Sequence, residues 1–110
     1  YDCPSIVIAY SPCIAHGYDL KFSMKQMKNA GQSGYSPLYR YNPANRLVGQ
    51  NPFTWDSEEP SIDFKEYTKG EIRYRALELS QPEEAERLQK LAEEDNQRRR
   101  EDLKKLQHED

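Results

Sequence analysis

One continuous apolar run, Ile-Val-Ile-Ala-Tyr at residues 6–10, limits the possible folds more than any other feature of the sequence. A short run rich in β-branched residues is typical of a strand that is buried on both faces, as inside a parallel sheet. Pro12 has no backbone N–H to donate to a neighbouring strand, so the strand is expected over residues 5–10. The loop at residues 13–17 then falls at the carboxyl end of this strand, where open α/β sheets gather their ligands.

The following segments predict a parallel crossover unit. Ser23 is expected to begin a short helix, with Gln26 completing a capping box and Gly34 as a natural stop. Alternation at residues 37–41 predicts a second strand. The order strand, helix, strand implies parallel pairing within an α/β fold. Two strands and one short helix cannot cover a run as apolar as residues 6–10, so the rest of the sheet is expected to come from outside these 110 residues.

The second half of the chain is predicted to be mainly helical. Residues 44–60 read as irregular because glycine and proline interrupt them. Ser61 is expected to cap a short helix that ends at Gly70. Residues 71–79 are ambiguous and favour helix.

The clearest predicted element is a helix over residues 82–106. Ser80 and Glu83 have the spacing of a capping box, and glutamates recur four residues before lysine or arginine. The apolar stripe of this helix breaks between Glu93 and Asp102. The pattern therefore predicts a helix that packs at its two ends and is solvated in the middle.

Composition limits the classes of partner. Charged residues make up 32% and hydrophobic residues 35% of the chain, and the mean hydropathy is −1.09. The chain is therefore expected to contain either a solvated helix or a surface that needs a partner. A formal net charge of −3 argues against a nucleic-acid binder. No apolar run is long enough to cross a membrane and no secretory signal is visible, so reduced thiols and a cytoplasmic location are expected.

Cys13 is the first candidate for chemistry. On composition alone, a cysteine after a buried strand reads as a small, inert residue. A metal site would have to draw on Cys3, His16 and His108, which leaves tetrahedral zinc with poor spacing. A cluster held by four thiolates would need more cysteines than the two present. Cys3 is expected roughly 20 Å from Cys13, at the other end of the strand, so the two should not form a disulfide.

The remaining polar candidates favour structural roles. His16 is expected to be a loop histidine bonded to backbone rather than a general base. Arg40 and Arg46 are expected in surface ion pairs or stacking contacts rather than on a phosphate. The basic run 98–100 reads as a solvated helix face. No glycine-rich phosphate loop or carboxylate pair is visible, so no catalytic residue is predicted.

Four blocks of sequence carry a resemblance to a known family. They are residues 5–17, which include Ser-Pro-Cys at 11–13, then residues 34–43, residues 51–57, and Pro-Glu-Glu-Ala at 82–85. In this order the chain resembles the C-terminal part of pyruvate:ferredoxin (flavodoxin) oxidoreductases. The resemblance implies oxidative decarboxylation of pyruvate to acetyl-CoA and CO2, with electrons passed through [4Fe-4S] clusters to ferredoxin or flavodoxin.

The resemblance also implies a place for the segment and a role for Cys13. Residues 1–60 would close an α/β domain that binds thiamine diphosphate, and residues 61–110 would form a helical C-terminal extension. Cys13 would supply the fourth thiolate of the [4Fe-4S] cluster nearest the thiamine. Residues for thiamine diphosphate, Mg²⁺, pyruvate and coenzyme A would lie elsewhere in the enzyme.

The implied partners are the remainder of the enzyme chain and the electron acceptor. The full enzyme would be a homodimer, without nucleic acid or membrane, and the 110 residues alone should be inactive. The alternative from another class is a non-enzymatic binding or scaffolding module that recruits a partner through its charged C-terminal helix.

Overall fold

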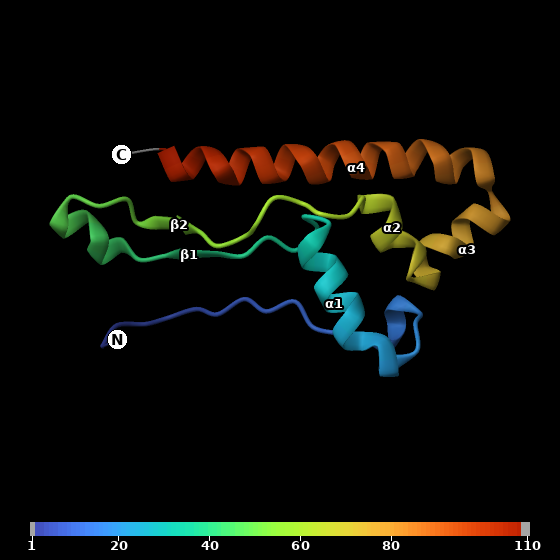
Figure 1. Ribbon diagram of the computed structural model, residues 1–110, viewed down its shortest axis with the longest axis horizontal. Helices are drawn as coiled ribbons and strands as arrows, with labels where there is room; N and C mark the ends of the chain where they lie inside the picture. The colour runs from blue at the N-terminus through green and yellow to red at the C-terminus, as the bar shows by residue number, and fades with distance from the viewer. Residues whose placement is uncertain (1, 109–110) are drawn as a thin grey trace.

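The computed structural model describes residues 2–108, so the outermost residues of both predicted domains, 1 and 109–110, lie outside the described range. The chain is elongated, with principal extents of 54 × 28 × 23 Å. Figure 1 shows its longest element, helix α4, running along most of that length. A two-stranded hairpin lies beside one half of α4, and the shorter helices gather near its other half. The helices are α1 (Ser23–Gln32), α2 (Phe64–Lys69), α3 (Ile72–Ser80) and α4 (Pro82–Lys105), and the strands are β1 (Tyr39–Tyr41) and β2 (Phe53–Trp55).

Helix α4 confirms the predicted long helix but not its predicted cap. Ser80 ends α3 instead, and its hydroxyl donates to the carbonyl of Ala76 at 3.0 Å, so it is not free to cap α4. Acidic residues in the first turn and lysines in the last turn suit the helix dipole. The ion pairs along α4 have i,i+3 spacing: Arg87 with Glu84, Arg98 with Asp95, and Lys105 with Asp102. Among residues 2–108, no helix is both long enough and apolar enough to cross a bilayer.

The middle of α4 is solvated on part of its surface only, whereas the broken stripe predicted a middle without packing contacts. Asn96 is 7% exposed, and its amide donates to the carbonyl of Ser33 at 3.2 Å. Arg99 donates to the carbonyl of Tyr35 at 2.5 Å and lies over the ring of that residue. An apolar stripe cannot reveal this contact, because α4 meets the turn after α1 through polar side chains.

The short helices match the predicted positions better than the predicted caps. Helix α1 begins at Ser23, but Gln26 is buried and bonds to Tyr67 of α2 and to Glu71, just before α3, instead of the start of its own helix. Helix α2 follows Asp63 rather than Ser61. Residues 71–79, which were ambiguous, fall almost entirely within α3.

The sheet differs from the predicted parallel unit. Strand β1 confirms part of the predicted strand 37–41, but it pairs antiparallel with β2, with Tyr41 opposite Phe53. The segment 44–60 was expected to be irregular, yet it supplies this partner. A 3-10 turn, η3 (Pro43–Val48), ends at Gly49 with φ +72° and reverses the chain locally, so no crossover helix is needed. Arg40 donates two hydrogen bonds of 2.8 Å to Asp56, which lower the pKa of that carboxyl.

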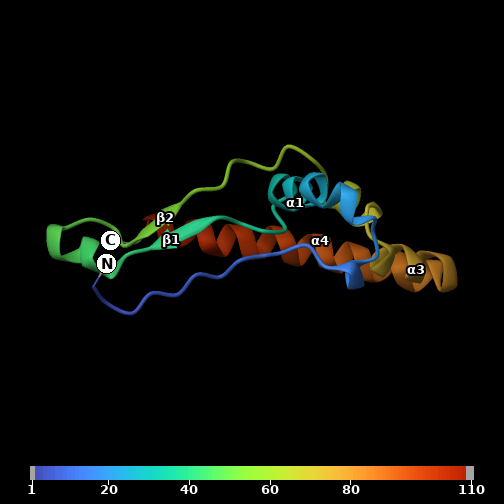
Figure 2. The same cartoon turned by 90° about the horizontal axis from the view of Figure 1, so that it is seen from below.

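The predicted buried strand at residues 5–10 is wrong for the described chain. These residues are extended, but they pair with no strand among residues 2–108. Ile6, Val7 and Ile8 are 89%, 91% and 86% exposed. Figure 2 shows this N-terminal arm running apart from the hairpin, and a groove of about 580 Å³ is lined by residues of the arm, β1 and α4. The two-stranded hairpin does not pair with the arm or cover it, so the aliphatic side chains of the arm stay exposed to solvent.

The isolated chain is therefore expected to aggregate. Covering each exposed aliphatic side chain of the arm would stabilise by about 1.5–3 kcal/mol, which favours self-association. The buried apolar core is small, with Ala30, Phe64 and Tyr67 at its centre. Gel filtration and near-UV circular dichroism of the free polypeptide test this expectation, and replacing Ile6 and Ile8 with serine should reduce the association. A monomer with a cooperative thermal melt would contradict it.

Candidate functional site

Cys13 stands at the start of a tight turn directly after the arm. It caps the 3-10 helix η1 (Ile14–His16) with an extended backbone, φ −146° and ψ 136°. Its carbonyl accepts from the backbone N–H of His16 at 3.1 Å. Cys3 and Cys13 are both free and exposed thiols. The turn thus presents Cys13 to the surroundings of the chain.

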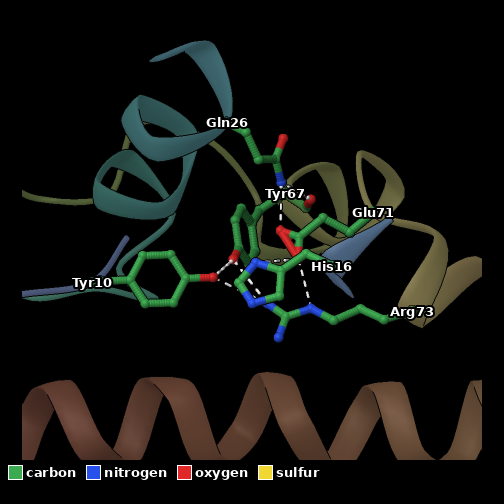
Figure 3. Close-up of polar contacts among 6 residues, drawn as sticks. All are labelled: Tyr10, His16, Gln26, Tyr67, Glu71 and Arg73. Atoms are coloured by element: carbon green, nitrogen blue, oxygen red, sulfur yellow. Dashed lines mark hydrogen bonds and ion pairs between the residues drawn. The ribbon is translucent and has the colours of Figure 1, made fainter. Parts of the chain in front are cut away.

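A compact set of polar side chains joins this turn to α1, α2 and α3, and we call it the anchor cluster. Figure 3 shows its six members, which come from the arm, η1, α1, α2, and the junction and start of α3. They are Tyr10, His16, Gln26, Tyr67, Glu71 and Arg73. Tyr10 precedes Cys13 and His16 follows it, so the cluster holds the chain on both sides of the cysteine.

Glu71 is the centre of the anchor cluster and is fully buried. One carboxylate oxygen accepts from the side-chain amide of Gln26 at 2.8 Å, and the other accepts from Nε of Arg73 at 2.6 Å. A buried carboxylate requires such partners, because an unpaired charge away from water is strongly unfavourable. Gln26 also donates to the carbonyl of Tyr67 at 3.2 Å, which joins α1 to α2.

Two phenol groups extend the anchor cluster to the arm. The hydroxyls of Tyr10 and Tyr67 lie 2.9 Å apart. Arg73 donates to both, at 3.1 Å to Tyr10 and 3.3 Å to Tyr67. Burial, followed by the hydrogen bond to Tyr10 and the charge of Glu71, raises the pKa of Tyr67 above its ordinary value. Tyr67 therefore stays a neutral hydrogen-bonding group and does not serve as a base near neutral pH.

His16 does not make the backbone hydrogen bond that was expected of its side chain. Its ring stacks on Tyr10, with ring centroids 5.9 Å apart. Nδ1 is buried without a hydrogen-bond partner and lies 3.9 Å from a carboxylate oxygen of Glu71, which is ion-pair range but too long for a hydrogen bond. The ring thus fills the space between the turn and the anchor cluster.

A backbone contact fixes the end of the turn. Gly17 has φ +77°, and its carbonyl accepts from the N–H of Ile72 at 2.9 Å. A Cβ at Gly17 would come within 2.6 Å of the Cβ of Ile72. Glycine is required here for both its left-handed backbone and its close approach to α3.

The other sequence candidates lie away from Cys13. Arg40 is engaged with Asp56, as expected of a surface ion pair. Of the basic run 98–100, Arg98 pairs with Asp95 on the exposed face of α4, whereas Arg99 binds the body of the fold. Among residues 2–108, no group of three or more His, Cys, Asp or Glu side chains is arranged to hold a metal ion.

Sequence reasoning did not single out the junction residues of the anchor cluster. Tyr67, Glu71 and Arg73 lie around an ambiguous helix boundary, and nothing in their spacing separates them from surface residues. Gln26 was noted only as a cap. Tyr10 at the end of the apolar run offers one signal, because a tyrosine hydroxyl that packs against protein usually finds a hydrogen-bond partner.

The sequence of the chain is similar to those of known pyruvate oxidoreductases. Over 96% of its length the chain is 47% identical to a pyruvate:ferredoxin oxidoreductase of Moorella thermoacetica, and also over 96% it is 44% identical to a pyruvate-flavodoxin oxidoreductase of Enterobacter agglomerans. Over 90% it is 46% identical to a probable pyruvate-flavodoxin oxidoreductase of Escherichia coli. The chain spans only 8–9% of the length of these relatives. No protein-family model matches it.

Proposed function

We propose that this chain is a segment of a pyruvate:ferredoxin or pyruvate-flavodoxin oxidoreductase. The observation that carries the proposal is the 47% identity over 96% of the chain to the Moorella thermoacetica enzyme. The reaction proposed for the whole enzyme is oxidative decarboxylation of pyruvate to acetyl-CoA and CO2, with electrons passed to ferredoxin or flavodoxin. The segment alone should be inactive, because it spans so small a share of its relatives.

Within that enzyme, we propose Cys13 as one ligand of a [4Fe-4S] cluster. Its free, exposed thiol on a fixed turn suits a group whose other ligands come from elsewhere in the protein. Thiolates are the ligands that such clusters use, and the bound cluster supplies one-electron transfer. This chain would bind the cluster through Cys13 and hold the turn in place. Three further cysteines would come from outside residues 1–110.

The remaining assignments follow from the same proposal. Residues 1–60 would complete an α/β domain that binds thiamine diphosphate, with residues 61–110 as a helical extension. The bare arm at residues 6–8 would be covered by that domain, which accounts for its exposure here. Thiamine diphosphate, Mg²⁺, pyruvate and coenzyme A would bind mainly through other residues of a cytoplasmic, homodimeric enzyme.

The test is an assay of the polypeptide that contains this segment, purified without oxygen. We expect reduction of ferredoxin or flavodoxin that requires both pyruvate and coenzyme A. Other 2-oxoacids, offered in place of pyruvate, would define the substrate. A purified protein that contains this segment but neither iron nor thiamine diphosphate, and reduces neither acceptor, would instead favour a binding module.

A further inference from the structure

We propose that Glu71 is a positioning residue for Cys13, acting through the anchor cluster. This inference rests on the proposed function, because it assumes that Cys13 binds a cluster. Glu71 does not reach the cysteine itself. It holds the groups that fix the chain on either side of the cysteine.

Three attachments tie the turn to the junction of α2 and α3. Before Cys13, the phenol of Tyr10 bonds to Tyr67 at 2.9 Å and to Arg73 at 3.1 Å. After Cys13, the ring of His16 lies against Glu71, with Nδ1 and the carboxylate 3.9 Å apart. The carbonyl of the following glycine accepts from the backbone of α3. All three attachments converge on the few residues around Glu71.

The burial of Glu71 distinguishes its ion pair with Arg73 from the ion pairs along α4. The ion pairs along α4 are exposed and join neighbours in sequence, so they contribute little to a unique structure. The carboxylate of Glu71 is fully buried and orients Arg73, which in turn reaches the phenol before Cys13. A buried ion pair is weak evidence for stability, because desolvation offsets its attraction, and a role in fixing geometry accounts for it better.

The polar shell behind a metal ligand commonly controls how firmly the metal is held. Replacing Glu71 with glutamine keeps the shape but leaves Arg73 without its buried counter-charge. Arg73 then loses its orientation, and the phenol of Tyr10 loses a fixed partner. The backbone on both sides of Cys13 becomes freer, so the iron bound there should be lost more easily.

The experiment measures iron release from the intact enzyme. Wild type and Glu71→Gln are purified without oxygen, and the transfer of iron to a colorimetric chelator is followed with time. We expect release from the affected cluster to be roughly tenfold to a hundredfold faster in Glu71→Gln. Electron paramagnetic resonance of the reduced enzymes should show an altered line shape. Tyr10→Phe, which removes only one hydroxyl, should give a smaller change in the same direction, and it serves as the test if Glu71→Gln does not fold.

Asn96→Ala is the matched control. It also removes a buried polar contact between elements, but at the middle of α4, away from the turn. A role of Glu71 in general stability alone predicts that both variants release iron at equal rates once their melting temperatures match. That result would overturn the positioning role. If Glu71→Gln cannot be obtained, iron release from Tyr10→Phe at the wild-type rate would overturn it as well. If Cys13→Ala keeps all its iron, the ligand assignment fails. If Cys13→Ala loses iron but Glu71→Gln releases iron at the wild-type rate, only the inference about Glu71 is rejected.

Discussion

Replacing Cys13 with alanine in the intact enzyme is expected to remove one [4Fe-4S] cluster. Under the proposed ligation, the change deletes one of the four thiolates of the cluster, and a cluster with only three cysteine ligands is lost or becomes labile. Iron analysis should fall by about four atoms per polypeptide, the content of one cluster. In the proposed reaction, decarboxylation of pyruvate could still begin, but pyruvate-dependent reduction of ferredoxin should collapse, since the proposed cluster is the first acceptor of the electrons.

Cys3→Ala is the control for this prediction. Cys3 is also a free and exposed thiol, and it precedes the apolar run of the arm, whereas Cys13 follows that run. Its removal should leave the iron content and the electron paramagnetic resonance spectrum unchanged. A full iron complement and normal ferredoxin reduction in Cys13→Ala would show that Cys13 is not a ligand.

Gly17→Ala is expected to have the second largest effect, by displacing the turn that carries Cys13. Alanine at φ +77° costs about 1–2 kcal/mol. Its Cβ would also meet the Cβ of Ile72 at 2.6 Å and the backbone N at 3.2 Å, and overpacking of this kind costs about 1–3 kcal/mol. The turn must therefore move away from α3 or open more often. Hydrogen exchange measured by mass spectrometry should show much faster exchange of the amides at the turn, together with weaker retention of iron.

Gly49→Ala separates the two contributions. Gly49 has φ +72°, close to that of Gly17, but a Cβ added there would meet nothing within 4 Å. It should therefore show only the backbone cost, with exchange about tenfold faster around its own turn and no loss of iron. Equal local effects in the two variants would mean that the contact between Gly17 and Ile72 yields easily.

The helices could be predicted from sequence because their signals are local. Pro82, the acidic first turn and the lysines of the last turn define α4 without reference to other elements. The caps could not be predicted in the same way. Gln26 fits a capping box by spacing, but its side chain bonds instead to Tyr67 and Glu71, which are far away in sequence.

In the candidate site, too, local features could be predicted from the sequence and long-range contacts could not. The residue type and the apolar run before it single out Cys13 as a candidate, and the family resemblance implies its role as a ligand. Tyr67 and Arg73 carry no signal in the sequence, because their importance arises only where α2 and α3 approach the arm.

The sequence by itself determined the long helix, the turn at Cys13 and the presence of an apolar arm that needs cover. These features depend on neighbouring residues, whose propensities and spacing act over a few ångströms. Tertiary structure alone decided the antiparallel pairing of β1 with β2, the polar contact of Asn96 with the turn after α1, and the burial of Glu71 at the junction of α2 and α3. Strand pairing and charge burial are long-range choices, and they depend on which distant segments meet and exclude water.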